Sequence, residues 1–164
     1  MARAVIGLGS NLGNGRQNLL AAWQRLQEKA GRAAALSSPY LTEPVGMASA
    51  QLFTNAVGIL DTKLSPPELL ATMLAVETAL GRDRQQGRDR TVDLDLLYYD
   101  DLVLTAAGLI LPHPAIAVRR FVLAPLAEIA PAHIHPLLRR TALQMLHDLP
   151  DDSGKVTRTT WENT

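Results

Sequence analysis

Two aspartates at alternating positions of one apolar segment are the residues of this sequence best suited to chemistry. Asp93 and Asp95 lie in a run of strand-forming residues over 91–99, where a period of two predicts a strand with two different faces. The apolar face is expected to carry Val92, Leu94, Leu96 and Tyr98, and the other face Thr91, Asp93, Asp95 and Leu97. Carboxylates at i and i+2 have Cα atoms about 6.5–7 Å apart. Their oxygens can therefore converge on shared Mg²⁺ ions, which prefer oxygen ligands.

The segment just before this strand is rich in arginine. Its basic residues are opposed only by Asp83 and Asp89, and they are Arg82, Arg84, Arg88 and Arg90. Guanidinium groups bind phosphate oxygens in a bidentate manner. Two Mg²⁺ ions about 3.5–4 Å apart can hold the attacking and the leaving oxygen of a phosphoryl displacement. An isolated Asp-x-Asp is more often a solvated pair on an edge strand. The arginines favour a metal-dependent site for a polyphosphate substrate.

Length and composition indicate one globular domain with a sizeable core, because 47% of the 164 residues are hydrophobic. We expect this domain to cover residues 1–147 and a polar, loosely held tail to cover 148–164. The balance of 16 basic against 16 acidic residues argues against a nucleic-acid or membrane-surface binder. There is no cysteine for a disulfide or thiolate site, and no apolar run approaches the roughly 20 residues of a membrane span. We expect a cytoplasmic monomer that acts on small molecules.

The order of predicted elements favours an α+β fold. We expect strands over residues 4–8, 33–41, 53–60 and 91–99, with helices over 16–30, which includes Trp23 as a core residue, and from Ser65 to Gly81. A hairpin turn is predicted at residues 100–101, leading into a strand over 102–104, and helices are predicted over 118–129 and 141–146. This order predicts a ferredoxin-like antiparallel sheet with helices on one face, plus the hairpin and C-terminal helices. The glycine-rich residues 9–15 lack nucleotide-loop spacing, so we interpret them as a structural turn.

The sequence resembles the 6-hydroxymethyl-7,8-dihydropterin pyrophosphokinase family of folate biosynthesis over residues 5–146. The matching motifs, in chain order, are Gly9-Ser10-Asn11-Leu12-Gly13, Thr42-Glu43-Pro44-Val45-Gly46, Phe53-Thr54-Asn55-Ala56-Val57, Glu77 with Gly81-Arg82-Asp83-Arg84, Arg90-Thr91-Val92-Asp93-Leu94-Asp95-Leu96-Leu97, Leu111-Pro112-His113-Pro114, and Arg119-Arg120-Phe121-Val122-Leu123-Ala124-Pro125-Leu126. The order of these motifs along the chain carries more weight than any one of them.

The resemblance implies transfer of the β,γ-diphosphate of ATP, the co-substrate, to the pterin hydroxymethyl group with release of AMP. It implies that Asp93 and Asp95 hold two Mg²⁺ ions and that Arg82 and Arg90 are catalytic. ATP would be bound by Glu77, Arg84, His113 and Arg119. The pterin would be bound by Thr42, Pro44, Val45, Phe53, Asn55 and Phe121, of which the two phenylalanines would stack on the ring.

One departure from the family pattern lies in the arginine-rich segment. The family usually carries Trp-Gly-Pro there, whereas this chain has Gly87-Arg88-Asp89 in a segment about two residues shorter. In the family this loop closes over the bound substrates, so the departure places that closure in doubt for this chain. A binding-competent but weakly active relative is therefore one alternative. Others are a two-metal nucleotidyl transferase or cyclase-like enzyme and an RNA-binding sheet. A metal site at His133 and His135 is disfavoured, since no carboxylates accompany them.

Overall fold

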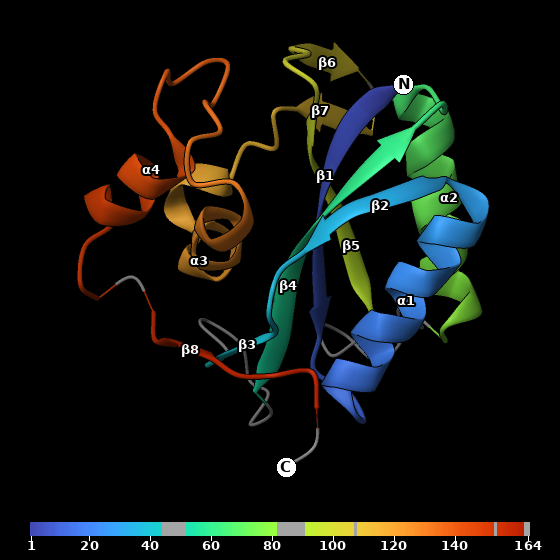
Figure 1. The fold of residues 1–164 in the computed structure, drawn as a ribbon, viewed down its shortest axis with the longest axis horizontal. Helices are drawn as coiled ribbons and strands as arrows, with labels where there is room; N and C mark the ends of the chain where they lie inside the picture. Colours follow the sequence, from blue (N-terminus) through green and yellow to red (C-terminus); the bar gives the residue numbers. More distant parts are fainter. Residues whose placement is uncertain (44–51, 82–90, 107, 153, 163–164) are drawn as a thin grey trace.

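An antiparallel sheet forms the centre of the computed structural model, which describes residues 1–43, 52–81, 91–106, 108–152 and 154–162. Its six strands are β1 (Ala2–Ser10), β2 (Gly31–Leu36), β3 (Tyr40–Thr42), β4 (Phe53–Thr62), β5 (Asp93–Tyr99) and β8 (Val156–Arg158). The order across the sheet is β5-β1-β4-β3-β8, and β2 also pairs with β4 (Figure 1). The predicted ferredoxin-like α+β sandwich is confirmed.

Helices α1 (Gly15–Lys29) and α2 (Pro66–Ala79) cover one face of the sheet (Figure 1). Asn14 caps α1 by accepting a hydrogen bond from the Gln17 amide, and Ser65 and Glu68 form a complete capping box on α2. The core on this side includes Trp23, as predicted, together with alternate residues of β1 and β5. Local capping and the apolar stripes therefore give both helices the boundaries expected from the sequence, within a few residues.

Helices α3 (Arg120–Ile129) and α4 (Ala142–Asp148) lie against the opposite face, which gives the sheet a second core (Figure 1). A short 3-10 helix, η2 (Ile116–Val118), leads into α3. The predicted strand pattern is wrong at Tyr98, which packs into this second core together with Leu97. The register of β1 against β5 shifts between Val5 and Ile6, and this irregularity breaks the two-residue alternation that placed Tyr98 on the other face.

Three other expectations are corrected by the observed strand pairing. The strand expected over 33–41 is divided into β2 and β3, and the predicted strand over 102–104 is replaced by a separate hairpin of β6 (Leu104–Ala106) and β7 (Leu109–Leu111). The tail is not loose, because β8 pairs with β3. The division into residues 1–147 and 148–164 stays a prediction.

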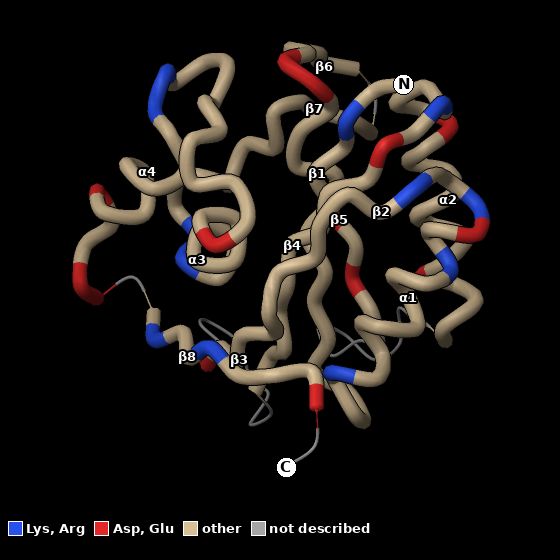
Figure 2. The backbone as a smooth tube through the Cα atoms, in the orientation of Figure 1, with Lys and Arg blue, Asp and Glu red and all other residues tan. Residues whose placement is uncertain are grey.

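Charged residues of both signs are interspersed along the described chain (Figure 2). This distribution matches the balanced composition of the sequence. Within the described ranges, no helix combines the length and the apolar character needed to cross a membrane.

Candidate functional site

Three residues in register on the central strands form the middle of the candidate site. Gly9 of β1 pairs with Asn55 of β4 on one side and with Asp93 of β5 on the other. Directly paired residues of antiparallel strands present their side chains on the same face. Asn55 and Asp93 therefore share a face and are separated by a residue that has no side chain. Two positions along β1, Gly7 pairs with Asp95 in the same way.

The amide of Asn55 is fixed by a threonine on the neighbouring strand. Its Nδ2 donates to Oγ1 of Thr42 over 3.0 Å, and both side chains are buried, with 6% and 4% of their surface exposed. Thr42 in turn pairs with Phe53, which begins β4 and is half-buried. Once Thr42 is bonded, Asn55 still has its Oδ1 and a second N–H to offer a ligand. The sheet thus brings together three of the predicted pterin-binding residues.

Asp93 and Asp95 lie half-buried at alternate positions of β5, on the face predicted from the sequence. Among the described residues, no group of three or more His, Cys, Asp and Glu side chains is placed to hold a metal ion. A carboxylate pair alone fits Mg²⁺, which usually takes one or two protein carboxylates and completes its shell with water and substrate phosphate. The donor set therefore fits a metal that binds together with a phosphorylated substrate.

His113 faces the carboxylate pair from the segment after β7. Its Nδ1 accepts the Ala115 amide hydrogen over 3.1 Å, so in the neutral ring the proton lies on Nε2, which is 3.9 Å from Oδ1 of Asp95. Burial lowers the pKa of His113; Asp95 opposes this shift, and Arg119 adds to it. A neutral imidazole whose Nε2 carries hydrogen is a donor to an anion such as phosphate and not a metal ligand.

Arg119 and Phe121 lie together where η2 meets α3. The guanidinium carbon of Arg119 is 5.6 Å from the centroid of the Phe121 ring, within the range of a cation–π contact. Helix α3 packs against β4, so both residues are on the same side of the sheet as Asn55 and the aspartates. The structure thus gathers predicted phosphate and pterin residues from distant parts of the chain on one face.

Glu77 is set apart from this group. It extends from α2, is 3% exposed, and its Oε2 accepts the backbone N–H of Leu94 over 2.7 Å. Leu94 lies between the two aspartates, so this hydrogen bond holds the backbone of β5 at the carboxylate pair from the helix side. The predicted contact of Glu77 with ATP stays a prediction.

Several predicted site residues lie outside the described residues. They are Pro44, Val45, Arg82, Arg84 and Arg90, and their roles stay predictions. The sequence analysis placed Gly9 in a structural turn and in the first motif of the resemblance, but not in the site. The structure corrects the turn assignment, because Gly9 lies within β1. Glycine weakens strand interiors and often marks a close approach of a ligand or another group. A glycine at alternate positions of the first strand was the signal available.

His133 and His135 contribute to packing. The ring of His133 lies 4.3 Å from that of Tyr98, centroid to centroid, and Nδ1 of His135 accepts the amides of Leu137 and Leu138. These contacts explain the pair as part of a turn that covers Tyr98.

Comparison with known proteins gives the family. Residues 5–131 match the model of the 7,8-dihydro-6-hydroxymethylpterin-pyrophosphokinase (HPPK) family. The chain belongs to this family. A 2-amino-4-hydroxy-6-hydroxymethyldihydropteridine pyrophosphokinase of Synechocystis is 41% identical over 148 residues, covering 89% of this chain and 75% of its own. The enzyme of the same name from Pseudomonas aeruginosa is 36% identical over 159 residues and is covered to 97%. The predicted diphosphotransferase activity and its assignment to folate biosynthesis are confirmed at this level.

Solved structures agree on the fold. Wild-type HPPK-DHPS from Plasmodium falciparum superposes with a TM-score of 0.73 at 14% sequence identity, covering 89% of this chain and 42% of that longer one.

A Dictyostelium discoideum folic acid synthesis protein is 35% identical, and this chain spans 22% of its length. In the family, the domain thus occurs both alone and within longer chains.

Proposed function

We propose that this pyrophosphokinase transfers the β,γ-diphosphate of ATP to 6-hydroxymethyl-7,8-dihydropterin and releases AMP in an Mg²⁺-dependent reaction. The observation that carries the proposal is the row of Asn55, Gly9 and Asp93 across the sheet. In this row, the amide of Asn55 could hydrogen-bond to the edge of a flat heterocycle, and the carboxylate of Asp93 could bind a metal ion and phosphate. Both lie on one face of the sheet, with Gly9 between them.

The pterin side of the site uses Asn55, Thr42 and the two phenylalanines. A pterin presents a donor–acceptor edge and two apolar faces, which an amide and aromatic rings complement. Because Thr42 holds Nδ2 of Asn55, the amide is already oriented before the ligand arrives, which lowers the entropic cost of binding. Phe53 and Phe121 would contact the ring faces.

The phosphate side uses the aspartates, His113 and Arg119. Nε2–H of His113 would donate to a phosphate oxygen, and the guanidinium of Arg119 would balance phosphate charge. Asp93 and Asp95 would hold two Mg²⁺ ions, which supply charge neutralisation and orientation of the polyphosphate when bound. Arg82 and Arg90 would act on the transferring group.

The reaction makes one phosphorus–oxygen bond and breaks one. The pterin hydroxymethyl oxygen attacks the β-phosphorus, the bond from that phosphorus to the oxygen bridging to the α-phosphorus breaks, and the hydroxyl proton is released. Such transfers depend mainly on positioning and electrostatic stabilisation, so no covalent enzyme intermediate is required. The rigid sheet residues would supply the positioning.

Nucleotidyl transfer is the second candidate, because the same aspartates suit it. It would release pyrophosphate and would give no role to the buried bond between Asn55 and Thr42. That bond favours the pterin reaction. The third candidate, a binding-competent but weakly active member of the family, would catalyse the same pterin reaction at a lower rate. We further propose that the protein acts as a cytoplasmic monomer on small molecules, without nucleic acid.

The deciding experiment mixes the protein with ATP, Mg²⁺ and 6-hydroxymethyl-7,8-dihydropterin and separates the adenine products. We expect AMP only when the pterin is present. Pyrophosphate without AMP would support nucleotidyl transfer. Tight pterin binding without AMP would indicate the weakly active relative. The absence of both AMP formation and pterin binding would contradict the proposal.

A further inference from the structure

The last residues of the chain cross the sheet beside the candidate pterin site. We call residues 154–162 the C-terminal strap. Its strand β8 pairs with β3 so that Val156 lies opposite Thr42, and beyond β8 the Thr159 amide donates to the carbonyl of Pro39 over 2.9 Å. The strap lies beyond residues 5–131, to which the family model is matched.

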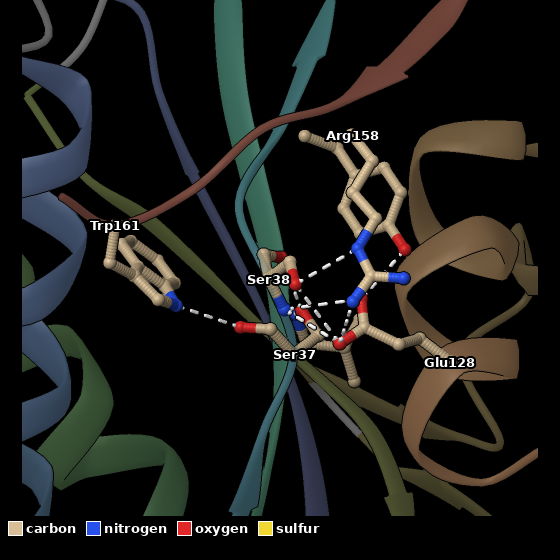
Figure 3. Close-up of polar contacts among 7 residues, drawn as sticks. Ser37, Ser38, Glu128, Arg158 and Trp161 are labelled. Atoms are coloured by element: carbon tan, nitrogen blue, oxygen red, sulfur yellow. Dashed lines mark hydrogen bonds and ion pairs between the residues drawn. The ribbon is translucent and has the colours of Figure 1, made fainter. Parts of the chain in front are cut away.

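The strap is attached to both layers of the protein. Trp161 and Arg158 approach residues 37–38 from opposite sides (Figure 3). Nε1 of Trp161 donates to the carbonyl of Ser37 over 3.0 Å, and its ring packs against the core beneath α1. The guanidinium of Arg16 at the start of α1 donates to the carbonyls of Thr160 and Glu162, both over 3.1 Å.

Arg158 reaches the other layer through Glu128 of α3 (Figure 3). Nε of Arg158 donates to Oγ of Ser38, and its Nη2 lies 3.6 Å from Oε2 of Glu128. The same carboxylate accepts the amide and hydroxyl of Ser38 and, over 2.7 Å, the hydroxyl of Tyr40. Glu128, which is half-buried, therefore gathers donors from β3, the preceding residues and the strap. We call Glu128, Ser38, Tyr40 and Arg158 the clamp.

The clamp joins two of the elements that carry predicted pterin-binding residues, β3 with Thr42 and α3 with Phe121. Strand β3 begins at Tyr40 and ends at Thr42, the acceptor of the Asn55 amide, whereas α3 begins beside Phe121 and carries Glu128 two turns later. Residues separated by seven positions lie on the same face of a helix. A shift of α3 relative to β3 would therefore change the position of Phe121 relative to Thr42.

Strand β3 has little support of its own, because it has three residues and would be an edge strand without β8. Short edge strands present unpaired backbone groups and hold their position weakly. We propose that the C-terminal strap and the clamp are positioning elements for the pterin, which fix Thr42, and through it Asn55, relative to Phe121. This inference rests on the proposed function.

The test compares dissociation constants for the pterin, titrated in the presence of Mg²⁺ and a non-hydrolysable ATP analogue, with those for the analogue alone. The variants are Glu128→Ala, Arg158→Ala, Arg158→Lys and a chain ending at Asp152. Arg140→Ala is the control, because Arg140 forms an exposed ion pair with Asp148, and among the described residues neither side chain bonds to β3 or to the strap. Thermal unfolding of each variant is recorded alongside.

We expect Glu128→Ala and the shortened chain to weaken pterin binding about tenfold, the equivalent of one or two hydrogen bonds. Arg158→Ala should weaken it about twofold to fivefold, as for an exposed ion pair, and Arg158→Lys should recover part of the loss. Affinity for the ATP analogue should fall less than affinity for the pterin, because β3 carries Thr42 but none of the residues predicted to bind ATP, whereas Arg119 lies beside Phe121 at the start of α3. The control should match the wild type in both.

Equal losses for the pterin and the analogue would overturn the inference, because they would mean a general loss of structure. Unchanged pterin binding in the Glu128 and Arg158 variants would also overturn it, and these point variants decide the matter if the shortened chain does not fold. If the wild-type protein itself bound no pterin, the proposed function would fail first, which is a different outcome.

Discussion

Gly9 and Asn55 face each other in register across β1 and β4, and a Cβ atom on Gly9 would lie 2.9 Å from Oδ1 of Asn55. That approach is shorter than ordinary side-chain contacts allow. The glycine therefore provides the space that the buried amide occupies between the strands that carry Thr42 and Asp93. This relationship makes the first strand part of the candidate site.

The variant Gly9→Ala tests that role directly. We expect the protein to fold, since the end of the Asn55 side chain can move, but its displaced amide should bind pterin about tenfold more weakly. Gly7→Ala is the matched control. On the same face of the same strand, its added Cβ would meet Leu97 at 3.6 Å, an ordinary contact. Equal pterin affinities for the two variants, measured by calorimetry, would mean that Gly9 has no specific role in pterin binding.

Substituting Asp95 by asparagine should abolish turnover without unfolding the protein. The side chain keeps its shape and is half-buried on the face opposite the α1 and α2 core. Loss of the charge should lower Mg²⁺-dependent AMP formation by about 10²-fold or more. The thermal midpoint should remain close to that of the wild type. Normal Mg²⁺-supported turnover in Asp95→Asn would contradict the assignment of the metal ligands.

Stability should fall in mild acid because several histidines are held neutral. Burial lowers the pKa of His133 and of His135, and it does the same for His113. The unfolded chain, whose histidines titrate near the ordinary value of about 6.5, then binds more protons than the folded chain. The contribution of these histidines to the free energy of unfolding is therefore fully present above about pH 6.5, and it declines as the pH falls below that value.

Urea unfolding at pH 7.5 and pH 5.5 measures this decline. His133→Phe keeps a ring against Tyr98 but cannot titrate, so its stability should change less between the two pH values than that of the wild type. His147→Gln, at an exposed position of α4, is the control and should behave as the wild type does. An unaltered pH dependence in His133→Phe would exclude His133 as a contributor.

Gly58 is required by the packing of Trp23. A Cβ at position 58 would lie 2.5 Å from Cη2 and Cζ3 of the buried indole. Gly58→Ala should therefore lower the free energy of unfolding by about 1–3 kcal/mol, the usual cost of overpacking a core. In the double variant with Trp23→Leu the clash disappears, so the two losses should sum to more than the measured total. Strict additivity by denaturant unfolding would contradict the clash.

Some features of the site are encoded locally and could be predicted. The shared face of Asp93 and Asp95 follows from the period of two in a single strand, and the start of α2 follows from Ser65 and Glu68. The position of Tyr98 could not be predicted in the same way. It depends on where β1 and β5 change register, and both strands contribute to that change.

The sequence by itself determined the family, the α+β class, the carboxylate pair and the residue types of the candidate site, because motifs and periodicity are properties of neighbouring residues. Only the tertiary structure decided that Gly9 separates Asn55 from Asp93, that Nε2 of His113 faces Asp95, and that a three-residue strand near the C-terminus pairs with β3. These relationships join residues far apart in the chain. Their geometry is set by strand register and by helix packing against the sheet, which no local pattern specifies.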